Sequence, residues 1–186
     1  MAVLGKLLKN KRAGETELAW NAPNLAGPDT LTMTSPDFAH ETTMPTIHVG
    51  KWYGGQDLSP ALVWDGGPDG TAQYLLMVED PDVPMSRPAI HCAALLDSTL
   101  TALPQGALAG ASPGRGVQLL RSTIGRGYHG PGPIKGHGPH RYVFELFALS
   151  TPLSGPDLAS AKTRTAIAAA GPVLARARLD GIYERR

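Results

Sequence analysis

Hydrophobic residues in the middle of the chain form short runs separated by turn-forming residues. The runs at 74–78, 89–97 and 141–149 are almost continuously apolar. Runs of this length, bounded by glycine and proline, are typical of strands buried on both faces. Weaker patterns at 61–64 and 116–124 complete the strands that we predict, and turn residues separate 61–64 from the next run.

The two flanking parts of the chain have different patterns. Residues 13–60 are polar with scattered glycine and proline, which predicts long loops and short strands. The segment 157–170 is rich in alanine and predicts a helix. A second helix is predicted at 173–179, with Pro172 in its first turn and Gly181 at its end. The whole pattern predicts a mainly β domain that ends in helices.

Charge and composition exclude several classes of protein. The chain has 186 residues, 17 basic against 16 acidic, with a formal net charge of +1. Nucleic-acid binding usually requires a clear basic excess, so we expect no nucleic-acid partner. The single cysteine, Cys92, allows neither an intrachain disulfide nor a four-thiolate zinc site. No apolar stretch is long enough to span a bilayer.

The first twelve residues, "MAVLGKLLKNKR", have apolar residues at helical spacing, interrupted by Lys6 and Lys9. A secretory signal needs an unbroken apolar region after its basic end, so we expect a cytoplasmic protein. The segment fits a short helix that docks on a membrane surface or a partner. It also fits a packed or frayed terminus, which is the interpretation that we favour.

Alternation along 140–149 divides its side chains between two faces. His140, Tyr142 and Phe144 share one face, and Arg141, Val143 and Glu145 share the other. His140 and Tyr142 can therefore line one pocket. Arg141 needs an acidic partner if it is half-buried, and we predict that Asp82 of the stiff "EDPDVP" segment supplies it as a structural ion pair.

His91 lies inside an apolar strand, where its ring must find a hydrogen-bond partner. Strand alternation predicts that His91 and Cys92 point to opposite faces and form no nucleophile–base pair. A core histidine with a satisfied ring is the alternative to a functional one. The loop "GPGPIKGHG" at 130–138 offers backbone amides stiffened by proline, and oriented amides of this kind can bind an anion.

Three kinds of site compete for these residues. A metal site would use His129, His137 and His140, with Asp80 as a further ligand, but their spacing is not that of a zinc motif and glycine-rich loops hold ligands poorly. A hydrolase would use Asp80 and His91 as a general base on bound water. An anion cradle explains more of the residues, with His140 in the pocket and His129 and His137 as loop or rim residues. We expect no metal and no cofactor.

Two motifs in this order resemble the phosphatidylethanolamine-binding protein family, in particular its bacterial Raf-kinase-inhibitor-like branch. They are "DPDVP" and, after a strand histidine, "GPGPIKGHGPHRYVFELFAL". Three further stretches agree: "LSPALVWDGGPDGT", "ALPQGA" and "VLARARLDGIYERR". The resemblance covers roughly residues 30 to 186, which we treat as one domain preceded by an N-terminal extension at 1–29.

The resemblance implies two antiparallel β-sheets with C-terminal helices, and a small pocket for phosphate-like or carboxylate-like anions. Its ligand-binding residues would be Asp80, His91, Gly132, Pro133, His140 and Tyr142. Ile134 replaces a common second proline and Cys92 replaces a frequent aromatic residue, so we expect an altered pocket mouth. The function implied is non-catalytic binding of a phosphorylethanolamine-like head group. The alternative is an inhibitor of a kinase or protease that acts through its surface on a protein partner, and bacterial members are often homodimers.

Overall fold

The structure is a computed structural model that describes residues 2–153, 164, 167 and 170–186. Its strands are β1 (Met33–Thr34), β2 (Thr42–Thr43), β3 (Leu62–Trp64), β4 (Gln73–Asp80), β5 (Ala89–Asp97), β6 (Ala102–Leu103), β7 (Val117–Leu119), β8 (His140–Leu149) and β9 (Val173–Tyr183). Its helical elements are α1 (Ala2–Leu8) and the 3-10 turns η1 (Ala19–Asn21), η2 (Pro23–Leu25), η3 (Thr46–His48) and η4 (Lys51–Tyr53).

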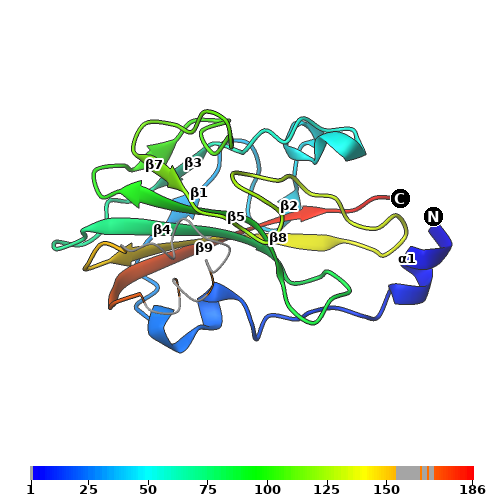
Figure 1. Cartoon of the computed structure of the whole chain (residues 1–186), viewed down its shortest axis with the longest axis horizontal. Helices are drawn as coiled ribbons and strands as arrows, with labels where there is room; N and C mark the ends of the chain where they lie inside the picture. The colour runs from blue at the N-terminus through cyan, green and yellow to red at the C-terminus, as the bar shows by residue number, and fades with distance from the viewer. Residues whose placement is uncertain (1, 154–163, 165–166, 168–169) are drawn as a thin grey trace.

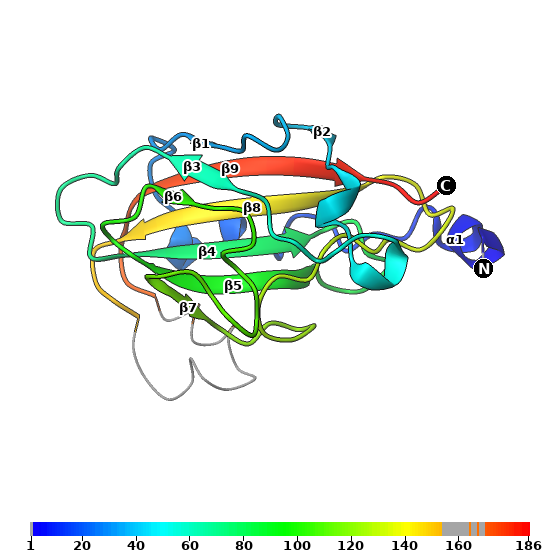
Figure 2. The ribbon, with the colours of Figure 1, turned by 90° about the horizontal axis from the view of Figure 1, so that it is seen from above.

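The strands form two sheets, as predicted for a mainly β fold. The large sheet has the order β2-β9-β8-β4-β5-β7, and the small one has the order β1-β3-β6. Neighbouring strands are antiparallel except for β2 and β9, which run parallel. The small sheet lies over one face of the long central strands (Figure 1), and the view from above shows the same layering (Figure 2). The predicted strands are present, although β7 is much shorter than the predicted 116–124.

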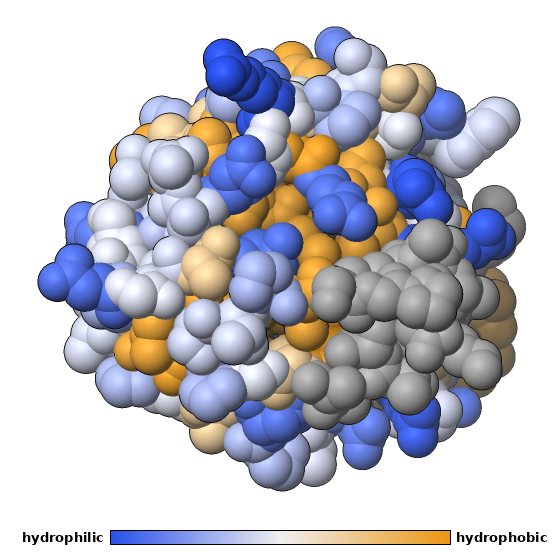
Figure 3. Space-filling model, turned by 60° about the vertical axis from the view of Figure 1, so that its left-hand side comes forward, coloured by the Kyte–Doolittle hydropathy of each residue, from blue (hydrophilic) through white to orange (hydrophobic). Residues whose placement is uncertain are grey.

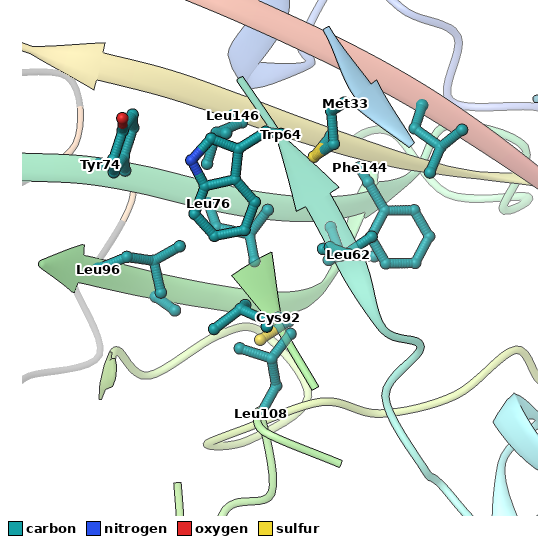
Figure 4. Close-up of a cluster of buried hydrophobic side chains, with 14 of the residues drawn as sticks. Met33, Leu62, Trp64, Tyr74, Leu76, Cys92, Leu96, Leu108, Phe144 and Leu146 are labelled. Atoms are coloured by element: carbon teal, nitrogen blue, oxygen red, sulfur yellow. The ribbon is translucent and has the colours of Figure 1, made fainter. Parts of the chain in front are cut away.

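The main hydrophobic core lies between the two sheets. Leu62 and Trp64 of β3 face Leu76 of β4 and Phe144 of β8, and all four side chains are buried. Figure 4 shows these side chains gathered between the strands. Burying a large apolar side chain contributes about 1.5–3 kcal/mol, so this layer is the principal source of stability.

The opposite face of the large sheet is covered by the N-terminal segment. Leu25 is completely buried there, and the ring of Trp20 lies 6.0 Å from that of Phe147. The guanidinium of Arg176 lies over the ring of Trp20, 3.9 Å from its centroid. Both faces of the central strands are therefore buried, which explains why their sequences are almost continuously apolar.

The predicted helix at 173–179 is wrong, because this segment is the long strand β9. Leu, Ala and Arg favour a helix intrinsically, but Val173, Ala175 and Ala177 are buried with half-buried residues between them. That period of two matches pairing with the whole length of β8. Gly181 does not end a helix but pairs with Tyr142 inside the sheet. The other predicted helix, at 157–170, lies mostly outside the described residues.

Apolar side chains also reach the surface. Figure 3 shows the side that is at the left in Figure 1, where an apolar area is surrounded by polar and charged side chains. Among the described residues, no helix is long and apolar enough to cross a membrane.

Candidate ligand-binding site

A cavity of about 950 Å³ opens at the end of the large sheet where β4 ends and β8 begins. All six residues predicted for the ligand site line it: Asp80, His91, Gly132, Pro133, His140 and Tyr142. The cavity is larger than the small pocket that we expected. Its mouth is built of side chains that the sequence did not point to, including Trp52, Tyr53, Met85 and Ile124.

Asp80 ends β4 at the floor of the cavity and is 1% exposed. The proline that follows holds its backbone extended, so its carboxylate has a defined direction. One oxygen accepts the backbone N–H of Asp82 (2.8 Å), and the other accepts a hydrogen bond from Nδ1 of His140 (2.8 Å). Asp80 therefore orients His140, and each of the two Asp80 oxygens accepts a hydrogen bond.

His137 is not a loop or rim residue, because it is completely buried behind His140. Its Nδ1 lies 2.7 Å from Nε2 of His140, and its Nε2 lies 2.9 Å from the carbonyl oxygen of Leu8 and 3.2 Å from that of Lys11. Sequence reasoning missed this role because the contacts come from the N-terminal segment. The signal available was the spacing of the two histidines on either side of Gly138 and Pro139.

Asp80, His140, His137 and the carbonyl oxygen of Leu8 form one row of hydrogen bonds, and the groups at its two ends accept only. A carbonyl oxygen only accepts, so Nε2 of His137 carries a hydrogen, and an ionised Asp80 only accepts, so Nδ1 of His140 carries another. The short contact between Nδ1 of His137 and Nε2 of His140 joins these two donors into one continuous row.

His91 presents a different arrangement. Its Nδ1 lies 2.7 Å from the carbonyl oxygen of His129 and therefore donates to it, and its ring packs edge-on against Tyr142 with centroids 5.1 Å apart. Its Nε2 has no hydrogen-bond partner among the described residues, and the side chain lines the cavity. Burial lowers the pKa of His91, although the charge of Asp80 opposes this shift. The neutral form of the His91 ring is therefore favoured at neutral pH.

The prediction that His91 and Cys92 point to opposite faces is wrong. Cys92 pairs with Val78 and Ile90 pairs with Glu79, so His91 is the extra residue of a β-bulge. The bulge interrupts alternation, and both side chains lie on the face that carries Tyr142. Cys92 is buried in the core and does not line the cavity, and burial raises the pKa of its thiol to about 12.

Gly132 and Tyr142 form one wall. The backbone N–H of Gly132 donates to the hydroxyl of Tyr142 (3.3 Å). A Cβ at position 132 would lie 2.2 Å from the ring of Tyr53, so only glycine lets this aromatic side chain lie against the loop. The guanidinium of Arg185 lies over that ring, 4.4 Å from its centroid, and also donates to the carbonyl oxygen of Pro133 (3.1 Å).

The structure brings Asp82 and Arg141 together as an ion pair behind the cavity. Nε and Nη2 of Arg141 donate to the two carboxylate oxygens of Asp82, at 2.9 and 3.0 Å. Arg12 adds a second contact to Asp82 at 2.9 Å. Arg141 also pairs with Glu15, so the N-terminal segment is tied to β8 at this point.

Asp57 is a further polar residue that sequence reasoning missed. It lines the cavity and accepts the backbone N–H of Gly130 (2.8 Å) through Oδ1. Its backbone has φ of +53°, a left-handed conformation that is uncommon outside glycine. Residues held in such conformations are often found at ligand sites, and among the described residues no hydrogen bond reaches Oδ2 of Asp57, which can accept one from a cationic group.

The arrangement does not favour the two other kinds of site. Among the described residues, no group of three histidine, cysteine or acidic side chains is arranged to hold a metal ion. Asp80 bonds to His140 and not to His91, so the proposed Asp80–His91 base is not assembled. No serine, threonine or cysteine is among the described residues that line the cavity.

Comparisons with known proteins agree with the resemblance. A family model described as phosphatidylethanolamine-binding protein matches residues 34–184. A UPF0098 protein of Mycobacterium tuberculosis is 35% identical over 170 residues, which cover 90% of this chain and 77% of the relative. The UPF0098 protein YbhB of Escherichia coli is 36% identical over 125 residues, 64% of this chain and 78% of the relative. The crystal structure of E. coli YbcL, described as a new member of the mammalian PEBP family, superposes with a TM-score of 0.75 at 30% identity and covers 84% of this chain and 99% of YbcL.

Proposed function

Because this chain belongs to the phosphatidylethanolamine-binding protein family, in the bacterial branch of YbhB and YbcL, we propose that its cavity binds a small anion such as a phosphorylethanolamine head group. The observation that carries the proposal is the free Nε2 of His91 at the cavity floor. When neutral, this nitrogen accepts a hydrogen bond from a protonated phosphate, and when protonated it donates a charge-assisted one.

His140 has another role in this proposal than the one expected from sequence. Both of its ring nitrogens are used, one by Asp80 and one by His137, so it shapes the cavity floor and offers no free donor. His91 is the residue that makes the direct bond. The lowered pKa of His91 rises again when an anion binds, because the anion favours the charged ring.

Asp57 supplies the contact that distinguishes a zwitterionic head group from simple phosphate. Asp80 cannot do this easily, because both of its oxygens are occupied. Asp57 lines the same cavity, and only its Oδ1 is engaged. An ammonium group beside Asp57 and a phosphate beside His91 would make a head-group site of opposite charges.

The role proposed is binding without turnover. A nucleophile beside a base is the usual requirement for ester hydrolysis, and the described residues of the cavity supply no such pair. A binding module of this kind is suited to regulation by ligand occupancy.

Calorimetric titration with phosphorylethanolamine, inorganic phosphate and ethanolamine at mildly acidic pH tests the proposal. The wild type is expected to bind phosphorylethanolamine best. His91→Gln should weaken binding at least about tenfold, whereas His40→Gln, a histidine outside the cavity, should not. Asp57→Asn should weaken phosphorylethanolamine binding and leave that of inorganic phosphate unchanged. Absence of heat with every ligand would refute the proposal and favour action on a kinase or protease through the protein surface.

A further inference from the structure

Large hydrophobic side chains are exposed at one end of the molecule. The described residues include eight of them. Three lie on α1 (Val3, Leu4 and Leu7), and four line the mouth of the cavity (Trp52, Tyr53, Met85 and Ile124). Only Val63 lies elsewhere, on β3. Isolated exposed apolar residues need no explanation, but a group gathered around one opening indicates an interaction surface.

Helix α1 turns its apolar side chains away from the protein. It packs through Gly5, where a Cβ would lie 2.2 Å from the carbonyl oxygen of Lys135 and 2.7 Å from the backbone nitrogen of His137. Val3 and Leu7, on the opposite side of the helix, are 71% and 78% exposed. The sequence favoured a packed or frayed terminus; the helix does pack, but through Gly5, while Val3 and Leu7 stay exposed.

The helix and the cavity mouth belong to the same end of the molecule. The loop that Gly5 contacts continues directly from Ile134, which lines the cavity. Figures 1 and 2 both place α1 at the end where β8 begins, on the same side as η4. Hydrogen bonds from His137 to Leu8 and Lys11, and from Arg12 to Pro139 (3.0 Å), attach the helix there.

The charges around these apolar residues are predominantly positive. The first fourteen residues contain four basic residues and no acidic one. Lys6, Lys9 and Lys11 are exposed, and Lys51, Arg126 and Lys135 are exposed at or beside the cavity mouth. Exposed apolar side chains surrounded by lysine and arginine fit the interface of a bilayer that contains anionic lipid. Tryptophan and tyrosine at the mouth are the side chains that favour this interface most.

We propose that α1 and the apolar cavity mouth form one docking surface for anionic membranes, which presents the cavity to lipid head groups. The inference rests on the proposed function for what enters the cavity, but docking itself needs only the surface. The docked protein lies on the bilayer with Leu7 and Trp52 in the interfacial region and the lysines among the head groups. Each lysine near the surface contributes about fivefold to the affinity.

Sedimentation with vesicles tests docking independently of ligand binding in the cavity. Vesicles of phosphatidylcholine alone are compared with vesicles of phosphatidylcholine and phosphatidylserine, both free of phosphatidylethanolamine. The wild type should bind the anionic vesicles and bind the neutral ones much more weakly. The pair Lys6→Gln and Lys9→Gln should weaken binding by about fivefold for each change. Val3→Ser with Leu7→Ser, and separately Trp52→Ser, should each weaken it at least about tenfold.

Matched variants separate this proposal from the previous one. Val63→Ser removes an exposed apolar residue on β3 and should leave vesicle binding unchanged. His91→Gln should lose phosphorylethanolamine binding but keep vesicle binding, and Leu7→Ser should do the reverse. Lipids brominated in their acyl chains should quench Trp52, and the quenching should disappear in Trp52→Phe, because Trp64 is buried and Trp20, half-buried against Phe147, does not line the cavity.

Three results would overturn the proposal. The wild type could fail to bind either vesicle, it could bind neutral and anionic vesicles equally, or it could bind anionic vesicles with unchanged affinity after the α1 and Trp52 substitutions. Circular dichroism of each variant establishes that the fold is intact, which is expected for the α1, Trp52 and Val63 variants because their substituted side chains are exposed.

Discussion

Nδ1 of His137 and Nε2 of His140 lie 2.7 Å apart, and this contact joins the cavity floor to the N-terminal segment. His140 continues the row to Asp80, and His137 continues it to the carbonyl oxygens of Leu8 and Lys11. The N-terminal segment lies outside residues 34–184, which match the family model. The contact therefore ties residues outside that match to the floor of the cavity.

His137→Ala should destabilise the protein by about 2–4 kcal/mol, measured by urea denaturation. The change leaves a buried nitrogen of His140 and two backbone carbonyls without their hydrogen bonds. It should also detach the helix, so limited proteolysis after Lys9 or Lys11 should accelerate. His40→Ala provides the control. Equal free energies of unfolding for the two variants would contradict a stabilising role for the hydrogen bonds of His137.

Anion binding should strengthen as the pH falls below the ordinary histidine value of about 6.5. Burial lowers the pKa of His91, so the ring gains its proton only in mildly acidic solution, and the charged ring binds an anion more strongly. Titration with phosphorylethanolamine across this range measures the effect. His91→Gln should give a much flatter profile, and a wild-type affinity that is independent of pH would rule out His91 as the direct contact.

Asp82→Asn should cost about 2 kcal/mol at neutral pH and progressively less in acid. Burial by itself would raise the pKa of Asp82, but hydrogen bonds from Arg141 and the charges of Arg141 and Arg12 outweigh it and lower the pKa. The stability that this carboxylate provides is therefore present above the ordinary aspartate pKa of about 3.9 and is lost as the pH falls through the lower value of the folded protein. Urea denaturation at neutral and acidic pH should show that the free energies of unfolding of the wild type and Asp82→Asn converge as the pH falls.

Glu145→Gln should make the protein more stable than the wild type in alkaline solution. Glu145 is completely buried beside Glu79, and burial together with the charge of Glu79 raises its pKa well above the ordinary value. Its neutral form therefore stabilises the fold at low pH, and this stability is lost as the pH rises through the raised pKa, by about 1.4 kcal/mol for each pH unit. Glutamine has nearly the same shape as glutamate and cannot ionise, so it avoids a second negative charge beside Glu79. Melting temperatures that decline equally with pH in both proteins would contradict this account.

Sequence reasoning succeeded where a contact follows from regular alternation. The faces of β8 were predictable because side chains alternate along an uninterrupted strand, and Arg141 and Asp82 lie together as predicted. Reasoning failed at His91, since one extra residue in β5 moves a side chain to the other face. It failed again at 173–183, because helix propensity is weaker than pairing with a long buried neighbour.

The sequence by itself determined the β-rich fold, the buried strands and six of the residues that line the cavity, because these depend on local patterns and short motifs. Only the tertiary structure decided what each histidine does. His137 became part of the floor because the N-terminal segment brings two carbonyl groups to it across more than a hundred residues, and His91 kept a free nitrogen because a backbone carbonyl satisfies the other one. Gly5 in turn determines that the apolar side of α1 faces outward, because only a residue without a Cβ fits against the loop before β8. Contacts between segments far apart in the chain leave no periodic signal in the sequence.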